Sequence, residues 1–166
     1  MQDVINRLRT KKADEGFTLI ELLVVVVIIG VLVAIAVPVY LNYRKGAADK
    51  SAQSDVRGAV STIEQYYTDN NNQYPNPTGG KIASQTASFS LYGASGTSAG
   101  GPTPASQPGG WITLSDKTTL TYAYVSATSS YLVCATNSGG SGKVYLYDST
   151  KGGSVNSASV AIGTCQ

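Results

Sequence analysis

The feature that most constrains this chain is a predominantly apolar segment near its N-terminus, from Phe17 to Val39, which contains a single ionisable residue, Glu21. As an α-helix, a segment of this length extends about 34 Å, enough to cross the hydrocarbon core of a bilayer. A charged side chain at the centre of a membrane helix costs about 2.5–3.5 kcal/mol, and less near an end. Because Glu21 lies near the start, we predict a membrane helix that retains an acid.

Two ordinary explanations of the segment compete. A secretory signal peptide would use the basic residues between Arg7 and Lys12 and a small-residue cleavage site at Ala34-Ile35-Ala36. The apolar part of a signal peptide is usually about 7–15 residues long and carries no carboxylate, which argues against this explanation. A plain single-pass anchor would place Glu21 at the headgroups, where its side chain could snorkel to water.

A third explanation rests on the ten residues from Gly16 to Val25, GFTLIELLVV, which resemble the start of type IV pilin precursors. Members of that family carry a short charged leader, which a prepilin peptidase removes after the glycine, and the new N-terminal phenylalanine is then methylated. The resemblance implies cleavage between Gly16 and Phe17 and N-methylation of Phe17. Glu15 departs from the family, which often has a basic residue before the glycine.

The resemblance also gives the acid a role. Cleavage would create an amino group at Phe17, four positions ahead of Glu21, and in the family this acid meets the N-terminal amine of a neighbouring subunit. Ion pairs that are poorly solvated are good candidates for setting register. Gly30 and Pro38 predict a kink or a tolerated bend in the helix. In assembled pilins the helix is similarly loosened between matching positions, here Gly30 to Pro38.

Beyond Pro38 the sequence predicts an amphipathic continuation of the helix. Apolar residues recur at three- and four-residue steps, while charged residues are assigned to other faces. The apolar positions are Ala52, Val56, Ala59, Val60, Ile63 and Tyr67, and the charged ones include Asp49, Lys50, Asp55, Arg57 and Glu64. We expect the helix to end between Asp69 and Asn72, before the prolines at 75 and 77.

The remainder of the chain predicts a small antiparallel sheet. Residues 78–110 are rich in Gly, Ser, Thr, Ala and Pro and are expected to form a long surface loop. Three β-branched and aromatic segments follow, at 120–125, 131–135 and 143–147, and predict a meander of three or four strands. One face of such a sheet can be buried against the apolar stripe of the helix, and residues 149–166 are expected to form a terminal loop.

The two cysteines, Cys134 and Cys165, indicate where the C-terminal part of the chain resides. Lys and Arg residues are equally frequent on both sides of the apolar segment, so the positive-inside rule does not set the orientation. An even cysteine count in a translocated domain suggests one disulfide, which predicts that the C-terminal part of the chain lies outside the membrane; the alternative is two buried free thiols. A cysteine pair near the C-terminus also resembles many pilins, in which the bridge pins a terminal loop to the sheet.

The chain lacks the usual residues of catalysis. It has no histidine and no glycine-rich phosphate loop between a strand and a helix. Asp148 alone offers too few oxygens for a calcium site, so we predict no metal, no cofactor and no enzyme activity. Residues 17–166 contain eight Lys/Arg and seven Asp/Glu. This balance predicts no direct nucleic-acid binding.

The predicted fold is α+β, a pilin fold with a long N-terminal helix on a small antiparallel sheet and a disulfide-pinned C-terminal loop. Its parts are a leader (1–16), a transmembrane and assembly helix (17–39), the amphipathic second half of that helix (40–72), a Gly/Ser/Pro-rich connecting loop (73–118), and the sheet with its C-terminal loop (119–166).

The resemblance implies a structural subunit that waits in the inner or cytoplasmic membrane as a precursor and then polymerises with other copies into an extracellular pilus. The implied partners are a prepilin peptidase, an assembly platform and an ATPase. The alternatives are a pseudopilin of a type II secretion or DNA-uptake system and, from another class, a secreted or anchored monomeric binding domain.

Overall fold

The computed structural model describes residues 17–77, 79–91 and 110–166 and contains one long helix and seven strands within them. The helix is α2 (Leu19–Asp69). The strands are β1 (Lys81–Gln85), β2 (Phe89–Ser90), β3 (Trp111–Ile112), β4 (Thr118–Val125), β5 (Ser130–Asn137), β6 (Val144–Asp148) and β7 (Asn156–Ala158). The chain divides into two compact units, residues 1–41 and residues 42–166. We refer to the second unit as the head.

The described part of the first unit is helical from Leu19 onward, and its large apolar side chains are exposed. Leu19 is 88% exposed, Leu32 61% and Ile35 65%, so the described part of the chain leaves most of the surface of these side chains uncovered. Among the described residues α2 is the one helix long and apolar enough to cross a membrane. The predicted apolar helix is therefore present.

The helix ends at Asp69, within the predicted range of Asp69 to Asn72. Asn71 and Asn72 have φ values of 55° and 58°, a left-handed conformation that stops an α-helix and that asparagine tolerates better than most residues. The N–H of Asn72 donates to the carbonyl of Tyr67 at 3.0 Å, which satisfies a carbonyl left free at the helix end.

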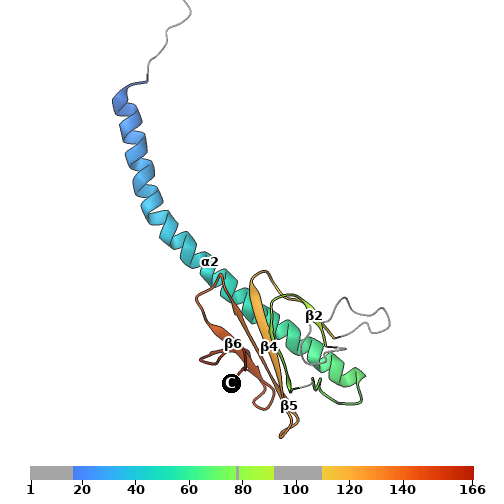
Figure 1. Cartoon of the computed structure of the whole chain (residues 1–166). Helices are drawn as coiled ribbons and strands as arrows, with labels where there is room; N and C mark the ends of the chain where they lie inside the picture. Colours follow the sequence, from blue (N-terminus) through green and yellow to red (C-terminus); the bar gives the residue numbers. More distant parts are fainter. Residues whose placement is uncertain (1–16, 78, 92–109) are drawn as a thin grey trace, which may run out of the picture. The chain divides into compact units, whose positions relative to one another are not determined.

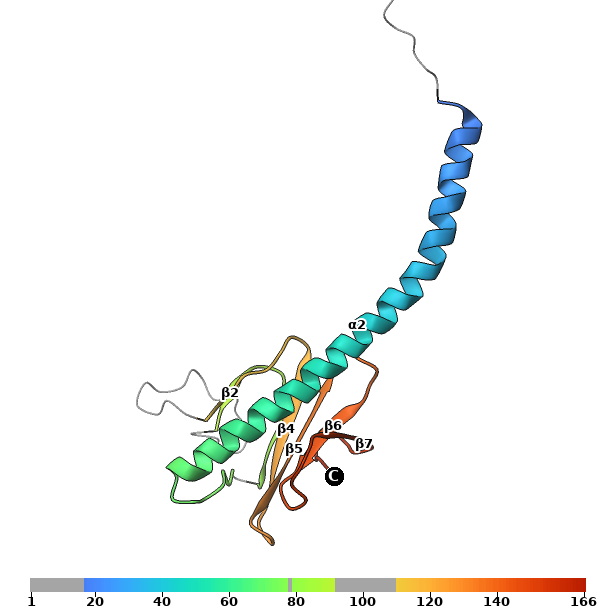
Figure 2. The ribbon, with the colours of Figure 1, turned by 180° about the vertical axis from the view of Figure 1, so that it is seen from behind.

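The head contains a five-stranded antiparallel sheet with the strand order β1-β4-β5-β6-β7. Strands β4 and β5 form its longest pairing, from Thr118 opposite Asn137 to Val125 opposite Ser130. Strands β2 and β3 form a separate two-stranded sheet. In both views of the ribbon the C-terminal half of α2 lies across the large sheet (Figures 1 and 2).

The two faces of the large sheet are both covered, because alternate residues of a strand point to opposite faces. On β5, Tyr131, Val133 and Ala135 belong to the core that includes the helix stripe, in which Ala52, Val56, Ala59 and Ile63 are buried. Residues between them, such as Leu132 and Cys134, belong to a second cluster with Ala123 and Cys165. The predicted packing of the stripe against one sheet face is confirmed.

Two aspartates of α2, which the sequence analysis assigned to faces other than the apolar stripe, are buried with that stripe. Asp49 and Asp55 are 6% and 8% exposed. Asp49 accepts hydrogen bonds from the backbone N–H of Ser141 (2.9 Å) and from its Oγ (2.5 Å). Asp55 accepts the same pair of bonds from Ser115, at 2.9 Å and 2.8 Å. Each carboxylate satisfies a loop N–H and a hydroxyl, which explains why it can be buried.

The expected connecting loop at 73–118 is also wrong in part. Strands β1, β2 and β3 lie within that range, and β1 extends the predicted meander by pairing with β4. The expected terminal loop at 149–166 likewise contains β7. Strands β2 and β3 have only two residues each, and β1 and β7 consist mainly of small or polar residues, so that alternation in these strands carries little hydrophobic signal. The predicted leader, residues 1–16, lies outside the described residues, as do residues 92–109 of the predicted loop.

Candidate functional site

The candidate site is the start of α2, where Thr18 precedes the first helical residue, Leu19. The Oγ1 of Thr18 accepts a hydrogen bond from the backbone N–H of Glu21 at 3.3 Å. In return, Glu21 Oε2 accepts bonds from the backbone N–H of Thr18 (2.8 Å) and from its hydroxyl (2.7 Å). This reciprocal arrangement is a capping box, in which a threonine before the helix and a glutamate three residues later satisfy backbone donors that have no partner in the helix.

The capping box gives Glu21 a role that the sequence analysis missed, although its signature, threonine followed three residues later by glutamate, is visible in the sequence. The carboxylate also lies in the first turn, where the positive end of the helix dipole favours an anion. Only Oε2 is engaged by Thr18, and within the described residues Oε1 accepts no hydrogen bond. One carboxylate oxygen thus remains available to a cationic partner.

Of the other residues predicted for this site, Gly16 lies outside the described residues. Phe17 directly precedes the cap and is 78% exposed. Gly30 and Pro38 lie inside α2, which is continuous through both. Helix loosening at these two positions therefore remains a prediction about the assembled state.

The second predicted pair, Cys134 and Cys165, forms a disulfide with a Cα–Cα distance of 5.7 Å. Both residues are buried in the cluster on the sheet face opposite α2. The bridge links β5 to the C-terminal segment, which is also closed by a bond from the N–H of Cys165 to the carbonyl of Ala161 at 2.9 Å. The predicted pinning of the C-terminal segment to the sheet is confirmed.

A group of tyrosines connects the end of α2 with the sheet. Tyr131 is fully buried and donates its hydroxyl to Glu64 Oε1 at 2.6 Å, and its ring centroid lies 4.9 Å from that of Tyr74. Burial, reinforced by the Glu64 carboxylate, raises the pKa of Tyr131 far above that of a free tyrosine. Burial likewise raises the pKa of Tyr122, whose hydroxyl donates to the carbonyl of Pro75 at 2.6 Å. These tyrosines are structural residues that join helix, turn and strand.

Asp148 is engaged locally. Its Oδ1 accepts bonds from the N–H and hydroxyl of Thr150, and its Oδ2 lies 3.3 Å from Lys151 Nζ. The Thr150 hydroxyl bond is the main cause that holds the pKa of Asp148 below its usual value, with Lys151 contributing less. Within the described residues no cluster of three His, Cys, Asp or Glu side chains is arranged to hold a metal ion.

Comparison with known proteins places this geometry in a family. Residues 11–37 match the model of the prokaryotic N-terminal methylation motif, which includes Gly16, Phe17 and the capping box. The chain is 38% identical over 89 residues to the type IV wide pilus major component PilA4 of Thermus thermophilus, an alignment that covers 51% of this chain and 68% of the relative. The chain belongs to the type IV pilin family.

Other relatives of this pilin match over shorter stretches of the chain. A fimbrial protein of Neisseria meningitidis serogroup A is 38% identical over 73 residues, and the type II secretion system core protein G of Aeromonas hydrophila is 37% identical over 65 residues. These alignments cover 44% and 39% of this chain and less than half of each relative, 43% and 45%. No solved structure matches the chain significantly.

Proposed function

We propose that this chain is the precursor of a structural subunit that polymerises through its N-terminal helix into a filament on the cell surface. The supporting observation is the combination of a folded, disulfide-linked head with an apolar helix whose large side chains are exposed throughout the described part of residues 17–41. Such a surface requires a cover, because a contiguous apolar patch of this size is not stable in water. The bilayer covers it in the precursor, and neighbouring subunits cover it in the filament.

The match to the N-terminal methylation motif at residues 11–37 supports the proposed sequence of events. A prepilin peptidase removes residues 1–16 and methylates Phe17, residues 17–39 serve as the transmembrane and assembly helix, and residues 40–166 form the exposed part. The precursor resides in the inner or cytoplasmic membrane, and an assembly platform and ATPase move it into the filament. Local loosening of the helix between Gly30 and Pro38 would let subunits adjust to one another as they pack.

Glu21 is proposed to direct assembly through its charge. Cleavage produces a cationic nitrogen at Phe17, and Glu21 Oε1 accepts no hydrogen bond from the described residues, so the carboxylate can pair with the nitrogen of a neighbouring subunit while Thr18 still holds Oε2. In a weakly polar environment two opposite charges attract far more strongly than in water, and an unpaired charge is costly. A subunit that docks out of register therefore leaves both charges unpaired.

Because the capping box is a competing explanation for Glu21, the experiment must separate cap from charge. Glu21→Gln removes the charge but keeps an oxygen that can accept the bonds of Thr18. Thr18→Val removes the cap hydroxyl at nearly constant volume and keeps the charge; loss of such a cap costs about 0.5–2 kcal/mol of helix stability. We expect Glu21→Gln and Glu21→Ala to insert into the membrane normally and to yield few or no filaments, and Thr18→Val to assemble.

The readouts are membrane fractionation and electron microscopy of sheared surface material. Normal filaments from Glu21→Ala or Glu21→Gln would refute the charge-pairing role. If Thr18→Val loses its filaments while Glu21→Gln, which keeps a cap oxygen, still forms them, Glu21 acts through the cap instead.

Cleavage is tested independently by N-terminal sequencing and mass spectrometry of the mature protein. The proposal requires a methylated Phe17 at the start. A start at Val37 would instead indicate ordinary secretion after Ala36 and would favour the secreted binding domain.

The second candidate is a pseudopilin, because core protein G of a type II secretion system is among the relatives. Its alignment spans 65 residues, whereas that with the wide pilus component spans 89. The longer alignment favours a pilus. Long filaments in electron micrographs support the pilus, and short filaments that appear only with an active secretion system support the pseudopilin.

A further inference from the structure

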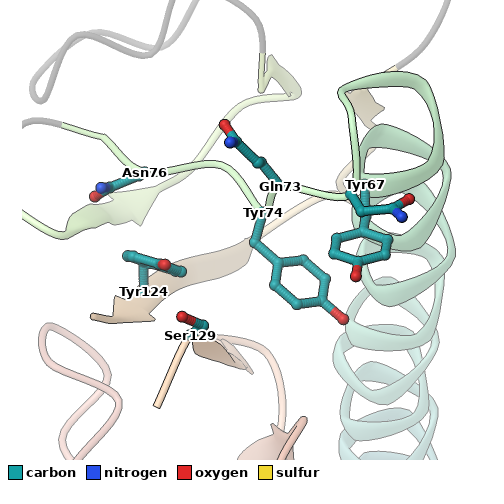
Figure 3. Close-up of a pocket in the computed structure, with 7 residues that line it drawn as sticks. Tyr67, Gln73, Tyr74, Asn76, Tyr124 and Ser129 are labelled. Carbon is teal, nitrogen blue, oxygen red and sulfur yellow. The ribbon is translucent and has the colours of Figure 1, made fainter. Parts of the chain in front are cut away.

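The head contains a pocket at the C-terminal end of α2, apart from the N-terminal residues to which the proposed function assigns assembly. Figure 3 shows it between the helix end, the turn that follows, and the β4–β5 hairpin. Its volume is about 420 Å³, within the range of small-molecule sites in proteins. The lining residues are Tyr67, Asn72, Gln73, Tyr74, Asn76, Tyr124 and Ser129.

The lining has an unusual chemistry, because the described residues that form it are tyrosines, side-chain amides and a serine, and none of them is charged. Each amide offers two donors and one acceptor, and each hydroxyl can act as either. Asn72, Gln73 and Asn76 are exposed, and no hydrogen bond from the described part of the chain engages their side-chain amides. Hydrogen-bonding groups are thus available among the residues that line the pocket.

The rings of the pocket, in contrast, are fixed by the fold. Tyr74 lies 4.5 Å from Tyr67 and 4.9 Å from Tyr131, measured between ring centroids. Tyr124 is held by β4, and its N–H donates to the carbonyl of Gly80 at 2.6 Å. A rigid aromatic wall lowers the entropy cost of ordering the site when a ligand binds.

We propose that this pocket binds a neutral saccharide, such as the terminal hexose or N-acetylhexosamine of a glycan. A sugar presents hydroxyls that both donate and accept, which amides match, and apolar C–H faces, which stack on tyrosine rings. The volume suits one or two sugar rings and is too small for a protein domain. Nucleic acid would require Lys or Arg, and neither residue type is among the described residues that line the pocket.

The Glu64 carboxylate, which contacts the aromatic wall of the pocket, determines which sugars fit. The Tyr74 hydroxyl lies 3.5 Å from Glu64 Oε2, and Glu64 also accepts the Tyr131 hydroxyl. A carboxylate behind the aromatic wall repels a second carboxylate. The site therefore selects neutral sugars over sialic acids and uronic acids. The inference rests on the head alone and does not depend on filament assembly.

The test uses the full chain in detergent micelles and, separately, sheared filaments. Saturation-transfer NMR is recorded with lactose and with di-N-acetylchitobiose as neutral probes, and with 3′-sialyllactose as the acidic probe. We expect transfer to at least one neutral sugar and weaker binding of sialyllactose than of lactose. Absence of transfer to both neutral sugars, or preference for sialyllactose, would overturn the proposal.

Variants locate the binding. Gln73→Ala and Asn76→Ala each remove an exposed amide that supports no structure, and each should weaken binding about fivefold. Tyr124→Phe, which keeps the ring, should change binding about twofold or less, whereas Tyr124→Ala should abolish it. Gln166→Ala is the matched control, since Gln166 is exposed and does not line the pocket.

Equal binding by Gln73→Ala, Asn76→Ala and Gln166→Ala would show that the sugar binds elsewhere and refute the assignment. A loss of filaments in Gln73→Ala and Asn76→Ala, without any sugar binding by the wild type, would identify the pocket as a contact for a second copy of the chain.

Discussion

Replacing Gly140 by alanine tests how the turn between β5 and β6 is held against α2. Gly140 lies in the turn between β5 and β6, with its N–H bonded to the carbonyl of Asn137 at 3.0 Å. A Cβ at this position would overlap Asp49 Oδ1 and lie 3.1 Å from its Cγ and 3.2 Å from the Asn137 carbonyl oxygen. Gly140→Ala therefore forces the Asp49 carboxylate to rotate away.

The cost follows from the bonds that the carboxylate makes. Rotation breaks the bonds from the N–H (2.9 Å) and the Oγ (2.5 Å) of Ser141 to Asp49. Hydrogen bonds to a charged group contribute about 1.5–3 kcal/mol each, and part of this is regained when the carboxylate meets water. We expect Gly140→Ala to lower the free energy of unfolding of the head by about 2–4 kcal/mol, or its Tm by about 5–15 °C.

The assay is thermal unfolding of the full chain in detergent, followed by near-ultraviolet circular dichroism, which reports the packing of the head's tyrosines rather than the helix in the micelle. Gly163→Ala is the matched control, because a Cβ there meets only Ser84 Oγ at 4.0 Å. It should change Tm little.

A double-mutant cycle provides the refutation. If the alanine acts by displacing Asp49, then Asp49→Ala with Gly140→Ala should be scarcely less stable than Asp49→Ala alone, since the displaced group is gone. Residues in direct contact are expected to be non-additive in this way. Additive losses, or a Gly140→Ala protein as stable as wild type, would show that the Asp49–Ser141 contact does not fasten the turn to the helix.

Two further predictions concern the other links within the head. Replacing both Cys134 and Cys165 by Ala opens a loop with a sequence separation of 31 and should lower the free energy of unfolding of the head by about 3–4 kcal/mol. A reductant should lower the Tm of the wild type and leave the Tm of the double variant unchanged. Burial and Glu64 raise the pKa of Tyr131, so the phenol stays neutral in the folded head, whereas in the unfolded chain it ionises near pH 10. The stabilising contribution of neutral Tyr131 to the free energy of unfolding is therefore complete below about pH 10. Above that pH it falls by about 1.4 kcal/mol per pH unit. Tyr131→Phe should make the decline of Tm above pH 10 shallower, and an unchanged slope would contradict this.

Much of this architecture could be predicted because its signals are local and repetitive. The apolar helix start, the stripe from Ala52 to Ile63, and strands β4, β5 and β6 all have a clear period or a strong β-branched and aromatic composition. Strands β1 and β7 could not be found in this way. They lie at the edges of the sheet, and their positions depend on the register of β4 and β6, which is a tertiary property.

The buried aspartates could not be predicted for a different reason. Their spacing placed them on the buried stripe, but their charge suggested an exposed position. Asp49 and Asp55 lie three residues before and after Ala52 and are thus in phase with the stripe that packs on the head. Hydrophobic periodicity treats a carboxylate as evidence of an exposed face, yet two carboxylates in phase with a buried stripe indicate loop donors across the interface. In this chain those donors are Ser115 and Ser141, from turns remote in sequence. Glu21 is a similar case, because the free-energy cost of a carboxylate in the membrane drew attention away from its role as a helix cap. Its charge and its cap are separable properties, so a variant that keeps one and loses the other decides which of them assembly requires.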